Sequence, residues 1–349
     1  MRYLSIILLL VFVSSCRDRH EQFASDDVVA DIMLPTTPVK DQGRSPLCWI
    51  YAMLATIETD RIAAGDSVNL SAMWLTRKSL EEQAVQSYLT GCGISMRGTL
   101  MEAMRLFHAY GIVGYDAAPS PQSMGQECSR EVEQVAQSMA AQHQGIGAMQ
   151  DALADVLDRT VGPMPRYAFM FGMEYTPQEF ARSCAMPGEW QAYTSFTHHP
   201  FGKPFCLELK DNMQRHEAIN VPADTLYNMV VRSLRSRHPV AWEGSLREVK
   251  SEKTLREVKS EKLKVKSYDY PVRGGGGQDF QTVRQKAFES FRLTDDHCMA
   301  IVGMGHRKDG TPVLICKNSW GREDGNGGFR YMTREEFMLS TILVMLNLK

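Results

Sequence analysis

Apolar residues recur at intervals of three and four along much of the first two thirds of the chain, which is the spacing of a buried helix face. The clearest case begins at Cys48 and runs to residue 64. Similar stretches, several bounded by Ser, Thr, Gly or Pro, predict further helices. They cover residues 71–86, 99–110, 131–139, 148–159 and 221–237, with one more short helix from residue 177.

Continuous apolar runs replace this spacing near the end of the chain and predict strands. They cover residues 239–243, 298–305, 312–318, 327–332 and 342–346. Helices followed by strands predict an α+β protein with two lobes. We expect a helical lobe over about residues 31–114, a helical insertion over about 115–200 and a β-rich lobe over about 201–349.

The first sixteen residues differ from the rest of the chain. Arg2 precedes an apolar run over residues 4–13, which is too short to span a bilayer and typical of a secretory signal. The run ends in Val13-Ser14-Ser15-Cys16, which resembles a bacterial lipobox with Cys16 as the lipidated residue. We expect a signal peptide over residues 1–16 and a mature chain over 17–349, exported and anchored by lipid to a bacterial membrane on its periplasmic or cell-surface side. The alternative is an ordinary secretory signal that contains a cysteine by chance.

Composition narrows the range of partners. The net charge is -2 and 23% of the residues are charged, so no basic field favours nucleic acid. The eight cysteines show no paired CxxC spacing, so no zinc cluster of that kind is expected.

A charged repeat interrupts the β-rich part. LREVKSEK occurs twice in succession, within residues 245–253 and 254–262, and a run of four glycines follows at 274–277. We interpret residues 245–277 as a duplicated surface excursion; a charged arm that contacts a partner is the alternative. The glycines lack the Lys-Ser/Thr pair of a phosphate-binding loop.

Cys48 is the candidate nucleophile. A thiol attacks as its thiolate, and the start of a helix lowers a thiol pKa because unpaired N–H groups and the helix dipole favour negative charge there. Taken alone, a cysteine in this pattern is more often a buried core residue. Gln42, six positions earlier, supplies an amide donor that could form an oxyanion hole with the Cys48 backbone N–H.

His297 and Asn318 are the candidate partners of this thiol. His297 immediately precedes one predicted strand, and Asn318 ends the next. Antiparallel pairing of the two strands would bring the side chains together, so that Asn318 orients the imidazole. Trp320 would cover that hydrogen bond from water.

Several short stretches contain or accompany these candidate catalytic residues. They are Thr37-Pro38-Val39-Lys40-Asp41-Gln42-Gly43, Cys48-Trp49, Leu70-Ser71, His297 and Lys317-Asn318-Ser319-Trp320-Gly321. Together they resemble the papain family of cysteine peptidases. Thr294-Asp295-Asp296-His297 and Tyr175-Thr176-Pro177-Gln178-Glu179-Phe180 are similar to its bleomycin hydrolase and aminopeptidase C branch.

The resemblance implies a papain-like fold with a helical left lobe and an antiparallel, β-barrel-like right lobe. It implies hydrolysis of peptide or protein substrates through a Cys48 thiolate, a His297 imidazolium and a thioester intermediate, which needs no metal or organic cofactor. Gly98 is the counterpart of the glycines that line the family's substrate cleft, and Trp320 is a second candidate substrate contact. Ser45 stands where the family usually has a cysteine.

The branch also carries a C-terminal arm that makes its members trim peptides from the amino end. No counterpart follows residues 342–346, so we favour an endopeptidase over an aminopeptidase of the bleomycin hydrolase type. Two alternatives come from other classes. One is an acyltransferase, in which an amine replaces water; the other is a non-catalytic, lipid-anchored peptide-binding module.

Overall fold

The computed structural model describes residues 27–120, 125–170, 172–246 and 279–349. The expected signal peptide with Cys16 lies outside these residues, as does the charged repeat except for Ser245 and Leu246. Nothing in the described part is a helix long and apolar enough to cross a membrane.

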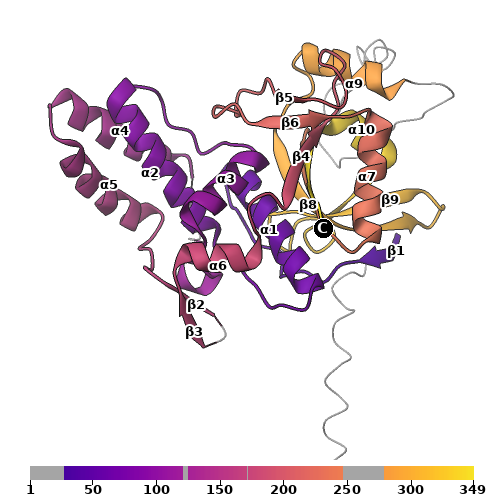
Figure 1. Ribbon diagram of the computed structural model, residues 1–349, viewed down its shortest axis with the longest axis horizontal. Helices are drawn as coiled ribbons and strands as arrows, with labels where there is room; N and C mark the ends of the chain where they lie inside the picture. The colour runs from indigo at the N-terminus through magenta and orange to yellow at the C-terminus, as the bar shows by residue number, and fades with distance from the viewer. Residues whose placement is uncertain (1–26, 121–124, 171, 247–278) are drawn as a thin grey trace, which may run out of the picture.

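The first part of the structure is helical, as predicted. Its helices are α1 (Cys48–Ala63), α2 (Ala72–Thr90), α3 (Leu100–Tyr110), α4 (Glu127–Ala141), α5 (Ile146–Thr160) and α6 (Pro177–Cys184), with a 3-10 turn η3 (Tyr115–Ala117) between α3 and α4. In Figure 1, α2, α4 and α5 extend to one side, while α1 lies next to the sheet. Residues Trp49 to Leu54 and Thr56 to Thr59 of α1 are all buried, so this helix is the core of the molecule rather than an amphipathic surface helix.

Local chemistry sets the ends of these helices. The Ser71 hydroxyl accepts from the Trp74 amide at 3.2 Å at the start of α2, and Gly91 ends α2 with a φ of 74°. Thr176 and Glu179 form a reciprocal capping box at the start of α6, with Pro177 in the first turn.

Nine strands form one open sheet. They are β1 (Val28–Met33), β4 (Trp190–Thr194), β5 (Pro204–Cys206), β6 (Glu217–Asn220), β7 (Val240–Gly244), β8 (His297–Arg307), β9 (Pro312–Lys317), β10 (Phe329–Thr333) and β11 (Thr341–Asn347). The nine-stranded sheet has the order β10-β9-β8-β7-β11-β4-β6-β5, and β1 pairs with β8 beside this path. All described pairs are antiparallel except β4 with β6. Because β10 and β5 end the order, this largely antiparallel sheet does not close into a barrel.

Three more helices accompany the sheet: α7 (Ala223–Arg235), α9 (Phe280–Glu289) and α10 (Arg334–Ser340). Figure 1 shows them on the sheet side of the molecule, away from α2, α4 and α5. Of these, only α7 was predicted.

The segment predicted as a helical insertion, residues 115–200, is not helical throughout. It contains a small hairpin, β2 (Ala168–Met170) with β3 (Met173–Tyr175), and also β4, which pairs with β11 in the main sheet. Trp190, Ala192 and Thr194 point inward from β4 and are buried, whereas the residues between them are half-buried. Because alanine and threonine on the inner face give a weak hydrophobic signal, the alternation did not predict a strand.

Candidate active site

Cys48 is the first residue of α1, as predicted, and its sulfur contacts β8. The Cys298 thiol donates a hydrogen bond to this sulfur, His297 makes another, and the charge of His297 acts in the same direction. These interactions hold the pKa of Cys48 well below its usual value, although burial alone would raise it. These neighbours of Cys48 therefore favour its thiolate form.

His297 and Asn318 meet as the strand pairing predicted. His297 begins β8 and Asn318 directly follows β9, the neighbouring antiparallel strand. His297 Nε2 lies 2.8 Å from Asn318 Oδ1, and both residues are buried. Because Asn318 Nδ2 donates to Asp324 at 3.0 Å, its oxygen faces the imidazole and accepts from the Nε2–H group. Nδ1 is then the ring nitrogen available to the sulfur.

Trp320 covers the imidazole. Its ring centroid lies 4.6 Å from that of His297, at an interplanar angle of 42°. The Arg330 guanidinium carbon lies 4.8 Å from the Trp320 ring centroid, and Arg330 also pairs with Asp324, which holds Asn318. The indole, the cation and the carboxylate together hold the imidazole and its amide partner in place.

Gln42 is held in place through both its backbone and its side chain. Its backbone N–H donates to the Ser319 carbonyl at 2.8 Å, and its Oε1 accepts from the Ser319 hydroxyl at 2.5 Å. Nε2 donates to the Ser45 carbonyl at 2.6 Å. These bonds tie Gln42 to the segment that carries Asn318, and an amide nitrogen has a second N–H to offer.

Gly98, the expected substrate contact, packs against the residue that follows the nucleophile. A Cβ atom at this position would lie 3.0 Å from the Trp49 ring. Trp49 Nε1 donates to the Met96 carbonyl at 2.9 Å, so the indole is fixed under this loop. The lack of a side chain at Gly98 therefore lets its backbone come close to the start of α1.

Two buried groups beside the nucleophile were not predicted. Burial and the bond to Cys48 raise the pKa of Cys298 well above its usual value, so this thiol stays protonated and donates. Glu243 pairs with Cys298 across β7 and β8 and is fully buried. Burial, followed by the charge of Asp295, raises the pKa of Glu243 well above its usual value. Both residues lie in segments predicted as apolar strands, and the sequence gives no sign that they interact with Cys48.

A buried network of ion pairs and hydrogen bonds connects the segments that carry the candidate site residues. Glu58 of α1 is fully buried and accepts from Lys40 Nζ at 2.5 Å, Thr37 Oγ1 at 2.6 Å and the Leu70 amide at 2.6 Å. Lys317, the last residue of β9, donates to the Thr37 hydroxyl at 2.7 Å. This network joins the loop before Gln42 to the helix of Cys48 and to the strand that precedes Asn318.

Comparison with known proteins agrees with this geometry. The profile of the Peptidase C1-like family matches residues 169–346, half of the chain. Cysteine endopeptidase Rep1 of Oryza sativa subsp. japonica is 44% identical over 61 residues, which are 17% of this chain and 16% of that protein. Vignain of Phaseolus vulgaris is 45% identical over 60 residues, 17% of each. The chain therefore spans about a sixth of the length of the curated relatives that it matches.

Among solved structures, PepW from Lactobacillus rhamnosis aligns with a TM-score of 0.65 at 17% identity, over 92% of this chain and 82% of that one. At this identity the likeness concerns the fold, and it confirms the predicted α+β class. The family profile covers β4 to β11 and so includes His297 and Asn318. This chain accordingly belongs to the peptidase C1-like family and has the papain-like fold.

Proposed function

We propose that this protein is a cysteine peptidase that hydrolyses peptide bonds with Cys48 as nucleophile and His297 as acid and base. The observation that carries the proposal is the His297 imidazole, held by Asn318 through Nε2 at 2.8 Å while it also contacts the Cys48 sulfur. A lowered thiol pKa and a fixed tautomer are what nucleophilic catalysis by this pair requires.

The reaction follows from these positions. The Cys48 thiolate attacks the scissile carbonyl, and the oxyanion takes hydrogen bonds from the Cys48 N–H and the second N–H of Gln42. The imidazolium gives its Nδ1 proton to the leaving amine, which leaves a thioester on Cys48. Neutral His297 then takes a proton from water, which hydrolyses the thioester and restores the thiolate.

The direct test uses the epoxide inhibitor E-64 and a peptide library. The purified, reduced protein should be labelled on Cys48 and should cleave library peptides, and the Cys48→Ala variant should do neither. Absence of both labelling and cleavage in the wild type would instead favour the non-catalytic, peptide-binding module. A product that appears only when an amine is added would favour the acyltransferase.

For the position of cleavage we propose endopeptidase action. The rice relative is named a cysteine endopeptidase, which supports this choice over the aminopeptidase alternative. Peptides with acetylated amino termini separate the two, since an aminopeptidase needs a free terminal amine. We expect acetylated and free peptides to be cut at the same internal bonds; cleavage restricted to free amino termini would contradict endopeptidase action.

We also propose that the protein is exported and anchored to a membrane through lipid on Cys16, on the basis of the lipobox-like Val13-Ser14-Ser15-Cys16. Cells that express the full chain should incorporate a radioactive fatty acid into it, and the protein should sediment with membranes. Cys16→Ala should abolish both results. Label that persists in this variant would contradict lipidation at Cys16.

A further inference from the structure

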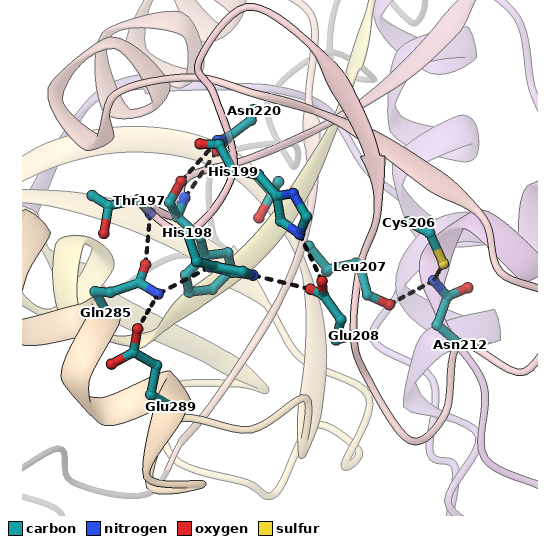
Figure 2. Close-up of polar contacts among 12 residues, drawn as sticks. Thr197, His198, His199, Cys206, Leu207, Glu208, Asn212, Asn220, Gln285 and Glu289 are labelled. Atoms are coloured by element: carbon teal, nitrogen blue, oxygen red, sulfur yellow. Dashed lines mark hydrogen bonds and ion pairs between the residues drawn. The ribbon is translucent and has the colours of Figure 1, made fainter.

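Two adjacent histidines and a glutamate meet at the end of the sheet order farthest from β10. His198 and His199 follow β4, and Glu208 follows β5, the edge strand. His198 Nε2 lies 3.1 Å from one Glu208 oxygen and His199 Nε2 lies 2.7 Å from the other, as Figure 2 shows. We propose that His198, His199 and Glu208 form a binding site for a divalent transition-metal ion, with zinc as the best match.

The donor set fits this ion. Two imidazoles and one carboxylate are a common ligand set for zinc, with water in the fourth position. Zinc–ligand bonds of about 2.0–2.1 Å put tetrahedral ligand atoms roughly 3.4 Å apart. One donor atom from each residue lies within 4.8 Å of the others, so side-chain shifts on the order of 1 Å would close the site. The side chains are 28%, 35% and 51% exposed, which leaves access for the ion and for water.

The loop that carries the histidines is already fixed. Asn220 is fully buried, and its Nδ2 donates to the carbonyls of Phe196 at 2.7 Å and His199 at 2.8 Å. Its Oδ1 accepts from the Phe196 amide at 2.9 Å. The His199 ring stacks on Phe205 at 4.2 Å between centroids. Much of the ordering that a metal site requires is therefore achieved when the protein folds.

On the opposite side, Asn212 fixes the loop of Glu208. Its Nδ2 donates to the Leu207 carbonyl at 3.0 Å, as Figure 2 shows. It also donates to the His216 carbonyl at 2.9 Å. Both halves of the site are thus held by buried amides, and an ion between them would cross-link the loop after β4 to the loop after β5.

Gln285 determines how tightly the site can bind. Its Oε1 accepts from the Thr197 amide at 2.6 Å, and its Nε2 donates to Glu289 at 2.9 Å and faces His198 Nδ1 at 2.9 Å. A neutral histidine that binds a metal through Nε2 carries its proton on Nδ1, where an acceptor stabilises it. The Gln285 Nε2 donor therefore disfavours the tautomer of His198 that carries its proton on Nδ1. A carboxylate there would accept the Nδ1 proton and still accept from Thr197.

Zinc binding should be measured on the full chain carrying Cys48→Ala, because the thiolate and imidazole of the active site can also bind zinc. Competition with a chromophoric chelator should show one zinc ion per chain. His198→Gln with His199→Gln should weaken it at least 100-fold, and Glu208→Gln about tenfold. Cobalt in place of zinc should give visible d–d bands without sulfur-to-metal charge transfer, which distinguishes this site from cysteine ligation.

A matched control is His216→Gln. His216 Nε2 lies 2.8 Å from Glu102, so it is a histidine–glutamate pair elsewhere in the structure, and its loss should leave zinc affinity unchanged. Melting curves without metal check that each variant folds, and zinc should raise the melting temperature of the Cys48→Ala protein but not that of the double-histidine variant.

The sharper test exchanges two side chains. Gln285→Glu with Glu289→Gln preserves composition and net charge but replaces the donor at His198 Nδ1 by an acceptor. Zinc affinity should rise about tenfold. No stoichiometric zinc binding would show that the three residues are a metal-free ion-pair cluster, and binding that survives the loss of both histidines would also overturn the proposal. Because all these measurements use a protein without the Cys48 thiol, they stand apart from peptidase activity.

Discussion

Single side chains around Cys48 set its reactivity, and they come from a strand that lies far from it in the sequence. Cys298 and His297 both lower the pKa of Cys48. The fully buried Cys298 thiol keeps its own proton and so acts as a fixed donor. The thiolate is therefore stabilised by two neighbours that are adjacent in sequence.

Cys298→Ala should shift the pH dependence of Cys48 alkylation by iodoacetamide to higher pH. Without the Cys298 S–H donor the thiolate loses a hydrogen bond, the pKa of Cys48 rises, and the thiolate fraction at acidic and neutral pH falls. At pH values below the new midpoint, the variant should be alkylated more slowly than the wild type. At pH values above it, the two rates should converge.

Cys316→Ala is the control for this experiment. Cys316 is a fully buried thiol of the neighbouring strand, and its interactions do not include Cys48. Its removal should leave the alkylation profile unchanged. An unchanged profile in the Cys298 variant as well would mean that the thiol does not act on Cys48.

Gln42→Ala should lower kcat by about 10²–10³ with a smaller change in KM, because its second N–H would act on the oxyanion rather than on bound substrate. Ser319→Ala is the matched variant. It removes the 2.5 Å bond to Gln42 Oε1 but leaves both amide protons, so its loss of kcat should be much smaller. Equal losses in the two variants would indicate that Gln42 acts only by holding the segment of Asn318.

At this scale the sequence pointed to Cys48, Gln42, His297 and Asn318, because each stands in a distinctive local context. Glu243 and Cys298 could not be found in the same way. Each is a strand residue whose interaction with Cys48 depends on strand pairing. The two histidines of the proposed zinc site were missed for a similar reason, since their third partner lies beyond the end of another strand.

At the scale of elements, α1 brings the nucleophile to the sheet and carries one acidic residue into the core. Glu58 is fully buried, with Lys40 and Lys317 as its cationic neighbours. Burial opposes its ionisation, but the charges of Lys40 and Lys317 prevail and lower the pKa of Glu58. The helix is thus joined by charge to the loop of Gln42 and to β9.

Glu58→Gln should lower the free energy of unfolding by roughly 3–5 kcal/mol at neutral pH, because it leaves buried cations without their counter-ion. A carboxylate with a lowered folded pKa stabilises above its unfolded pKa, and that stabilisation is lost as pH falls through the folded pKa. The deficit of the variant should therefore shrink below about pH 4. Urea unfolding at several pH values tests this. A deficit that stays constant down to acidic pH would contradict the charge network.

Arg61→Gln is a surface control on the same helix. Arg61 pairs with Asp66, and both side chains are partly exposed, at 28% and 39%. Its loss should cost less than about 1 kcal/mol and add little pH dependence.

Helices α2, α3 and α6 were predicted well because a capping side chain marks the start of each apolar stretch, whereas apolar spacing alone predicted α1, which has no side-chain cap. The short strands β5 and β6 carry few apolar residues, and only their partners make them strands. Helix α10 is seven residues long and was missed although Thr333 and Glu336 form a capping box there. Elements of this length give too little periodicity to recognise.

At the scale of the whole molecule, β11 joins two groups of strands. It lies between β7 and β4. The sheet continues beyond β7 with β8, β9 and β10, and beyond β4 with β6 and β5. All seven of its residues are buried. The α+β class was predictable from the order of patterns along the chain. The strand order was not predictable, because an apolar run does not indicate which other strand it pairs with.

Deletion of residues 341–349 should abolish cooperative unfolding, since it removes a fully buried central strand and its bonds to both neighbours. Deletion of residues 348–349 removes the Leu348 bond to Glu189 at 2.8 Å, the Lys349 N–H bond to Asn347 at 2.9 Å and the half-exposed Lys349 ion pair, and should cost less than about 1 kcal/mol. Thermal melts followed by circular dichroism compare the two. A cooperative melt without β11 would contradict this account of the sheet.

The position of β11 has a consequence for biosynthesis. Cys48 leaves the ribosome long before β11, the strand that pairs with both β7 and β4. Until β11 emerges, β7 and β4 lack the neighbour that lies between them in the sheet. The nine-stranded sheet can therefore be completed only after residue 347 has been translated.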